Sequence, residues 1–167
     1  IQNLMVLRFA NLIFEPLWNR NYVSSVNITW SEKIGVSGRA GYFDQYGIIR
    51  DVMQNHLMQI LALVAMEPPI NLDAESIRDE KVKALKCVAP LTINDVVIGQ
   101  YCRSEDGKTP GYMEEPGVPK DSITPTYAKA SFKINNYRWD GVPFKLLAAK
   151  AYDKTCTEIR INFKEVP

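Results

Sequence analysis

Residues 38–57 read GRAGYFDQYGIIRDVMQNHL, and this stretch contains the only histidine of the 167-residue chain, His56. The segment before it is rich in glycine, which predicts a hinged loop over residues 31–47. A helix is predicted over 48–67, because its apolar residues cover much of the helix circumference, and Pro68 and Pro69 end it. The stretch therefore predicts a glycine-rich loop that runs into a largely buried helix.

The chemistry of this stretch depends on His56 and on Asp51, five residues ahead of it. A histidine with a nearby carboxylate is the usual minimum for general-base catalysis near neutral pH. In an α-helix, steps of about 100° per residue place Asp51 roughly 140° around the axis from His56. Asp51 therefore cannot be assumed to orient His56, and direct binding of a substrate is another role for it. The alternative for His56 is that of a satisfied, partly buried polar residue.

The remaining elements follow from hydrophobic periodicity. Apolar spacing predicts a helix over 3–17, and alternation of β-branched residues predicts a strand over 22–30. Asp73 is the expected N-cap of a helix over 74–87 with a charged outer face. Beyond these, the chain shows a polar surface loop over 103–121 and strands over 96–101, 126–135, 142–152 and 158–163. Helices followed by strands predict an α+β domain over 1–167, with N-terminal helices packed on a mainly antiparallel sheet.

Composition argues against several classes of function. The net charge is +1 and the pI is about 7.8, so no bulk electrostatic argument supports a nucleic acid or membrane partner. The longest apolar run, 60–66, is far shorter than the roughly 20 residues of a membrane span. The three cysteines are widely spaced and there is one histidine, so no metal site is expected. No G-x-G-x-x-G motif follows a predicted strand, so no Rossmann domain is expected within the chain.

Two lysines and one carboxylate complete the candidate site. Lys150 and Lys154 lie four residues apart near the end of a predicted strand, and two ammonium groups converging from a turn suit a phosphate. Glu32 follows the strand over 22–30 and could accept hydrogen bonds from sugar hydroxyls. On spacing alone, a solvated lysine pair and an exposed glutamate are the alternative explanation.

Longer runs of residues connect these separate signals. They are LRFAN (7–11), PLWNR (16–20), GYFD (41–44), GIIRDVMQNHL (47–57), LVAME (63–67), RDEKVK (78–83), GQY (99–101) and RWDGVPF (138–144). In order and spacing, over essentially the whole chain, they resemble the C-terminal domain of glucose-6-phosphate dehydrogenase. A block as long as 38–57 is far more specific than a short motif.

The resemblance implies NADP-dependent oxidation of glucose 6-phosphate to 6-phosphogluconolactone, the first step of the oxidative pentose phosphate pathway. His56 matches the catalytic base, which removes the proton of the C1 hydroxyl while hydride passes to NADP. Asp51 and Glu32 match residues that bind the sugar hydroxyls, and Lys150 matches a lysine that contacts the substrate. Lys154 matches the second lysine of the bacterial-type K-x-x-x-K pattern.

The resemblance also implies parts outside this sequence. The Rossmann domain, which binds most of NADP, and the family's RIDHYLGKE motif would precede Ile1, and the last strands and helices of the domain would follow Pro167. We therefore expect a domain that is incomplete at both ends, inactive alone and prone to aggregation. Positions that match a second, structural NADP site hold Leu147 and Cys156, with only Arg160 kept, so that site is not expected.

In this family the sheet forms a dimer interface, so the resemblance implies a homo-oligomer for the full-length protein. The expected compartment is the cytoplasm, with a plastid as the alternative. The alternative function is that of a non-catalytic truncated paralogue, which acts as a dimerisation or binding module.

Overall fold

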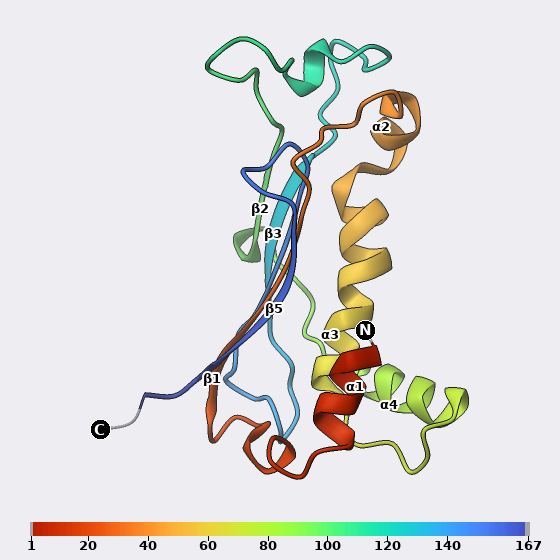
Figure 1. Cartoon of the computed structure of the whole chain (residues 1–167), viewed down its shortest axis with the longest axis vertical. Coiled ribbons are helices and arrows are strands. Elements are labelled where there is room, and N and C mark those ends of the chain that lie inside the picture. The colour runs from red at the N-terminus through yellow and green to blue at the C-terminus, as the bar shows by residue number, and fades with distance from the viewer. Residues whose placement is uncertain (1, 166–167) are drawn as a thin grey trace.

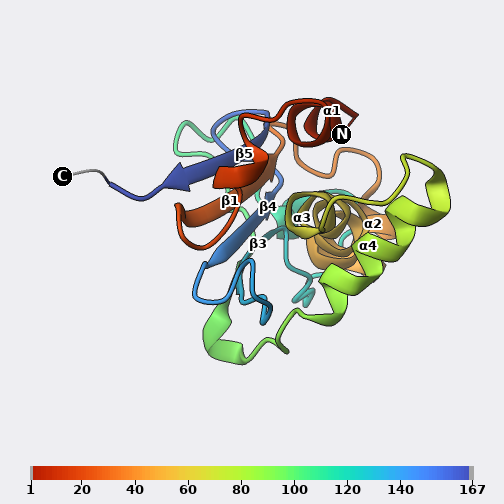
Figure 2. The same cartoon turned by 90° about the horizontal axis from the view of Figure 1, so that it is seen from below.

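Strands and helices separate into two layers in the computed structural model, which describes residues 2–165 (Figures 1 and 2). A twisted sheet forms one layer and the helices cover one of its faces. The strands are β1 (Val23–Ser31), β2 (Val96–Gly99), β3 (Tyr127–Phe132), β4 (Phe144–Ala149) and β5 (Cys156–Phe163). This arrangement confirms the predicted α+β class.

The five strands have the order β2-β3-β4-β1-β5. All neighbours run antiparallel except β1 and β4, which run parallel with Val26 beside Phe144 and Ser31 beside Ala149. Alternate side chains of the two strands are fully buried, such as Val26 and Ile28 on β1 and Phe144 and Leu146 on β4. A mainly antiparallel sheet was predicted, and its one parallel pair brings two strand C-termini together at the same edge.

The helices are α1 (Gln2–Phe9), α2 (Ala40–Ile48), a π-helix (Ile49–Leu57), α3 (Met58–Ala65) and α4 (Ala74–Lys86). The π-helix and α3 form one long column beside the sheet, with α2 at its upper end (Figure 1). The π-helix packs against β1 and β4, and α3 packs against α1 and α4. The predicted helix over 48–67 is therefore present, but its first half is a π-helix.

Three side chains cap the end of α3. Arg8 donates to the carbonyl oxygens of Leu63 and Val64 over 2.8 and 3.2 Å. The indole nitrogens of Trp18 and Trp139 donate to the carbonyl oxygens of Val64 and Ala65, each over 2.9 Å. The last carbonyls of a helix have no partner within the helix, so these donors satisfy groups that would otherwise be buried unpaired.

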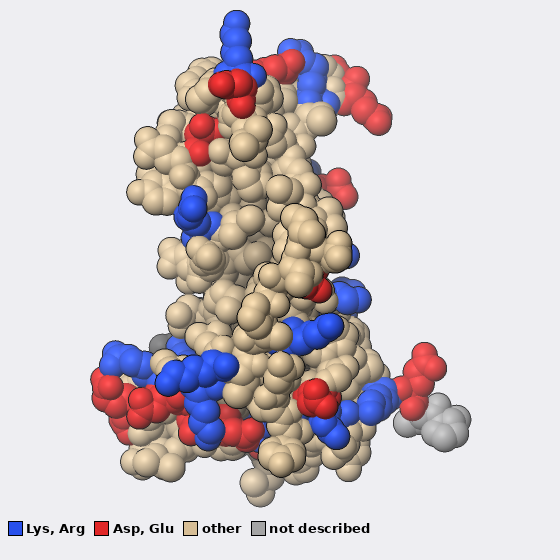
Figure 3. Space-filling model, turned by 180° about the vertical axis from the view of Figure 1, so that it is seen from behind, with Lys and Arg blue, Asp and Glu red and all other residues tan. Residues whose placement is uncertain are grey.

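The helix α4 carries the charged surface that was predicted for it. Its N-cap is Asp73, whose side chain accepts a hydrogen bond from the Ser76 amide, as expected. Charged side chains of both signs gather at the end of the molecule that holds α4, at the lower left of Figure 3, while the middle of that face is mostly uncharged. Ion pairs within α4 join Arg78 to Glu75 and Lys83 to Glu80.

Two boundaries in the N-terminal part were predicted wrongly. The helix over 3–17 ends at Phe9, and Ile13, which was expected on its buried face, is exposed. A separate 3-10 turn starts at Glu15, with Pro16 in its first positions, since proline has no amide hydrogen with which to continue an α-helix. The loop over 31–47 contains α2, because burial of Ala40 and Phe43 outweighs the low helix propensity of its glycines.

The later boundaries differ less. The β2, β3 and β4 strands are shorter than the predicted ranges, and β5 begins two residues earlier, at Cys156. The segment 103–121 was predicted as a surface loop, but it includes a 3-10 turn over Tyr112–Glu114, and Tyr112 is fully buried. Tyr112 packs edge-on against Phe43 and Tyr101, so this segment is part of the core.

Candidate functional site

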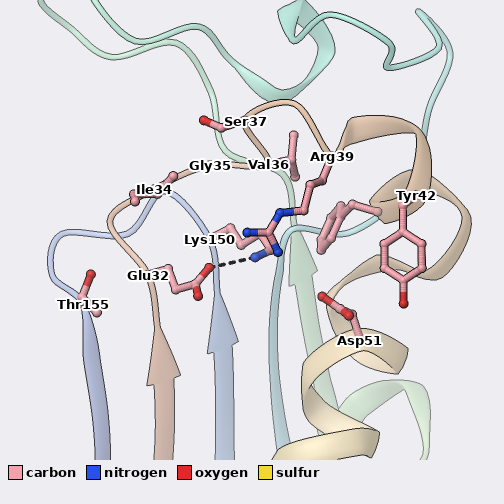
Figure 4. A pocket seen from close by; sticks show the side chains of 11 residues that line it. Glu32, Ile34, Gly35, Val36, Ser37, Arg39, Tyr42, Asp51, Lys150 and Thr155 are labelled. Atoms are coloured by element: carbon pink, nitrogen blue, oxygen red, sulfur yellow. Dashed lines mark hydrogen bonds and ion pairs between the residues drawn. The ribbon is translucent and has the colours of Figure 1, made fainter.

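The parallel pairing of β1 and β4 places two candidate residues side by side. Glu32 follows β1 and Lys150 follows β4, each one residue beyond the last registered pair. The Glu32 amide donates to the Ala149 carbonyl, which continues the ladder past the strand ends. The Lys150 ammonium donates to the Glu32 carboxylate over 2.8 Å (Figure 4). Residues that lie 118 positions apart in the sequence thus form one ion pair.

This ion pair lies in a cavity of about 260 Å³. Asp51, from the first turn of the π-helix, points into the same cavity from the opposite side (Figure 4). Other polar or aromatic side chains in its wall are those of Ser37, Arg39, Tyr42, Phe43 and Thr155. The cavity therefore offers two carboxylates and two cations, a combination suited to a small ligand that has both hydroxyl and anionic groups.

Lys150 is held from several sides. Its Nζ lies 5.4 Å from the centre of the Trp30 ring and 5.4 Å from that of the Phe43 ring, so both aromatic faces stabilise the cation. Its side chain is 13 % exposed, whereas that of Glu32 is 37 % exposed. The ammonium is thus fixed in direction, and the carboxylate remains open to the cavity.

The loop between β1 and α2 forms part of the cavity wall and is held there by hydrogen bonds. The Val36 amide donates to the Tyr101 hydroxyl over 3.2 Å, and that hydroxyl donates to Glu115 over 3.0 Å. Burial raises the pKa of Tyr101 to about 12, which keeps its hydroxyl protonated at neutral pH. A Cβ atom on Gly35 would lie 2.7 Å from the Tyr101 hydroxyl oxygen, so a larger residue here would have to displace the Tyr101 side chain.

The π-helix changes the expected relation between Asp51 and His56. Hydrogen bonds in a π-helix run from residue i to i+5, and the amide of Met58 accordingly donates to the Met53 carbonyl. Two residues that are five apart, such as Asp51 and His56, therefore lie on roughly the same side of the π-helix, one turn apart. This corrects the separation of about 140° that was expected from an α-helix. His56 lies one turn beyond Asp51 along the same helix. Its side chain is exposed and is not part of the cavity wall.

Lys154 stands apart from the other candidates. It is exposed on the turn between β4 and β5, and it is not part of the cavity wall. Its contact with the strands is through the backbone, since the Ser31 hydroxyl donates to its carbonyl over 2.8 Å. The structure therefore brings Glu32, Asp51 and Lys150 together in one cavity and leaves both His56 and Lys154 outside its wall.

Sequence reasoning did not single out the other polar and aromatic residues of the cavity wall, which are Ser37, Arg39, Tyr42, Phe43 and Thr155. Arg39, Tyr42 and Phe43 had a signal, because they lie inside the 38–57 stretch that was singled out at the start. Thr155 had none, since it reaches the cavity only through the pairing of β1 with β5. Within residues 2–165, no helix is long and apolar enough to cross a membrane, and no cluster of His, Cys, Asp or Glu could hold a metal ion.

Fold and cavity together define an α+β domain with a charged pocket for a small polar ligand. Residues 5–167 match the model of the family described as "Glucose-6-phosphate dehydrogenase, C-terminal domain". The chain therefore belongs to the glucose-6-phosphate dehydrogenase family.

Individual relatives agree with this assignment. Glucose-6-phosphate 1-dehydrogenase of Dictyostelium discoideum is 60% identical over 164 residues, which cover 98% of this chain and 33% of the relative. Chloroplastic glucose-6-phosphate 1-dehydrogenase 1 of Arabidopsis thaliana is 59% identical over 169 residues, which cover 100% of this chain and 29% of the relative. A solved structure described as "Glucose-6-phosphate dehydrogenase in complex with its substrate glucose-6-phosphate" has a TM-score of 0.95 at 49% identity, covering 99% of this chain and 34% of that one. The chain thus spans about a third of the length of these relatives.

Proposed function

We propose that this chain carries the sugar-binding site and the general base of an NADP-dependent glucose-6-phosphate dehydrogenase, which oxidises glucose 6-phosphate to 6-phosphogluconolactone. The observation that carries the proposal is the meeting of Glu32, Asp51 and Lys150 in one cavity, with His56 one π-helical turn away. Membership of the family supports it, as does the solved relative that is described with its substrate.

Each residue has a role that fits its place. Oxidation at C1 removes a hydride from the carbon and a proton from its hydroxyl, and we assign the proton to the imidazole of His56. Glu32 and Asp51 accept hydrogen bonds from sugar hydroxyls, since both carboxylates face the cavity. Lys150 donates to a substrate oxygen from its fixed position between two rings. For Lys154 we propose a peripheral electrostatic contribution, because its side chain lies outside the cavity.

NADP supplies the acceptor for the hydride in this proposal. A Rossmann dinucleotide site has a short G-x-G-x-x-G turn between a strand and a helix of a parallel sheet. In residues 2–165, the stretch from β1 into α2 contains Gly35, Gly38 and Gly41 but does not have this pattern. These residues do not form a Rossmann site, and we propose that a Rossmann domain of the full-length enzyme holds most of NADP.

The experiment that tests the function places this chain in a complete enzyme. The matching third of the Dictyostelium discoideum enzyme is replaced by this chain, and NADPH formation is measured with glucose 6-phosphate and with glucose. We expect activity with the phosphorylated sugar and a much lower kcat/KM with glucose. A soluble, folded chimera without activity would favour the non-catalytic binding or dimerisation module.

A matched pair of substitutions tests the arrangement of the two lysines. Lys150→Met is expected to raise the KM for glucose 6-phosphate about tenfold or more, because a charge-assisted hydrogen bond contributes about 1.5–3 kcal/mol. Lys154→Met removes the same charge from an exposed position and is expected to raise KM less than threefold, as for a screened surface charge. Steady-state kinetics of the two chimeras decide the question. An equal rise in KM for the two variants would contradict the placement of Lys150 in the binding site and Lys154 outside it.

Two further parts of the proposal concern the whole protein. We propose a homodimer through the sheet, which mass measurement of the chimera in solution would test. The relatives include enzymes named as chloroplastic and as cytoplasmic. We propose the cytoplasm as the compartment, with a plastid as the alternative.

A further inference from the structure

Asp44, a residue outside the cavity, accepts three hydrogen bonds from a distant segment, two at its carboxylate and one at its backbone carbonyl. Asp44, on α2, accepts from the hydroxyl of Tyr112 over 2.7 Å and from the hydroxyl of Ser122, both at the same oxygen, Oδ1. Its backbone carbonyl accepts from the hydroxyl of Thr124 over 2.8 Å. The three donors lie in the segment 112–125, which is part of the connection from β2 to β3. Asp44 itself does not line the cavity.

The same segment also holds the junction between α2 and the π-helix. The Ile48 amide donates to the Pro125 carbonyl over 2.9 Å. At Gly47 the backbone has φ +64°, and a Cβ atom there would lie 3.1 Å from Thr124 Cγ2. The chain thus bends at Gly47 in close contact with the segment, four residues before Asp51. Together, Asp44 and the bend at Gly47 hold the C-terminal half of α2 against this segment.

The helix α2 contributes two side chains to the cavity, so its position affects the shape of the cavity. Tyr42 lines the cavity, and the ring of Phe43 is one of the two that hold the Lys150 ammonium. The π-helix that bears Asp51 begins directly after α2. A rotation of α2 would therefore move the aromatic wall, the support of the lysine and the start of the π-helix together.

We infer that Asp44 is a positioning residue, which fixes α2 and thereby the geometry of the substrate cavity. The inference rests on the function proposed above and adds a residue that does not touch the substrate. Hydrogen bonding from Ser122 holds the pKa of Asp44 below its usual value, so the side chain is an ionised acceptor at neutral pH. Burial raises the pKa of Tyr112, so its hydroxyl stays a donor.

The kinetic test compares three variants of the chimera, well below its unfolding temperature. Asp44→Ala removes the shared acceptor and is expected to raise the KM for glucose 6-phosphate about tenfold or more, since small displacements of binding groups have large effects. Asp44→Asn keeps an oxygen at Oδ1 and is expected to recover most of the affinity. The control is Asp106→Asn, another carboxylate that accepts from a serine hydroxyl, but within an exposed turn, and it is expected to change nothing.

A second measurement separates this inference from the proposed function. Amide hydrogen exchange over residues 40–53 is expected to rise in Asp44→Ala and to stay unchanged in Asp106→Asn, whether or not the parent chimera is active. An inactive parent with this exchange pattern would overturn the proposed function and support the attachment of α2. Unchanged exchange in Asp44→Ala would overturn the inference. So would raised exchange with an unchanged KM in an active chimera, since Asp44 would then contribute to stability alone.

Discussion

His56→Asn is expected to lower the kcat of the chimeric enzyme by about 10²–10⁴-fold, the usual contribution of a general base. Asparagine keeps a polar side chain of similar size but cannot take up the proton that leaves the C1 hydroxyl. Because His56 is not part of the cavity wall, the KM for glucose 6-phosphate should change much less than kcat. The measurement is NADPH formation at saturating glucose 6-phosphate.

The control for this prediction is Gln54→Asn, an exposed polar residue on the same π-helix. It should leave kcat unchanged, because the substitution shortens a side chain without removing a base. A wild-type kcat in His56→Asn would exclude its role as the base. A similar loss in both variants would point to damage of the π-helix instead of loss of chemistry.

Arg8→Met is expected to destabilise the fold by about 3–5 kcal/mol, as when one partner of a buried ion pair is removed. The Arg8 side chain is fully buried, and it bonds the Glu15 carboxylate in addition to the two carbonyls at the end of α3. Burial lowers the pKa of Arg8 to about 10, so the guanidinium stays charged at neutral pH. Methionine preserves the apolar stem but removes the donor of the Leu63 carbonyl, whereas the Val64 carbonyl keeps Trp18 and the Glu15 carboxylate keeps Arg138. Urea unfolding of the chimera, followed by tryptophan fluorescence, measures the difference.

Arg20→Met provides the comparison for Arg8. Arg20 forms an ion pair with Asp140, but both side chains are largely exposed. Surface pairs of this kind contribute about 0–1 kcal/mol, so the unfolding curve should hardly move. Equal destabilisation by the two substitutions would mean that the burial of Arg8 and its capping of α3 add nothing to the free energy of unfolding beyond a surface ion pair.

Local patterns predicted most of the secondary structure. Asp73 and the charged outer face marked α4, and alternation of β-branched residues marked β1. The π-helix had no such signal, because the residues of 49–57 also suit an α-helix and only the backbone hydrogen bonds distinguish the two. The α2 helix was missed for a related reason. Gly41 and Gly47 favour a loop, and the burial of Phe43 that outweighs them is visible only in the tertiary structure.

The candidate site was predictable in part. Similarity to a family indicated Glu32, Asp51 and Lys150, and the structure places all three in one cavity. Residue patterns alone could not have joined them, because the parallel pairing of β1 with β4 is not encoded in either strand. The segment 103–121 reads as polar and proline-rich, so nothing in its sequence indicated that Tyr112 is buried beside α2.

The position of β1 in the sheet has a consequence for biosynthesis. Its two neighbours, β4 and β5, come from residues after 143, so both edges of β1 stay open while most of the chain is translated. Contacts between segments so distant form slowly, and an open strand is a template for wrong pairing. The Glu32–Lys150 pair closes only when β4 has taken its place. The pair therefore forms only after residues 144–150 have been synthesised, and a chaperone that shields β1 until then should increase the yield of folded protein.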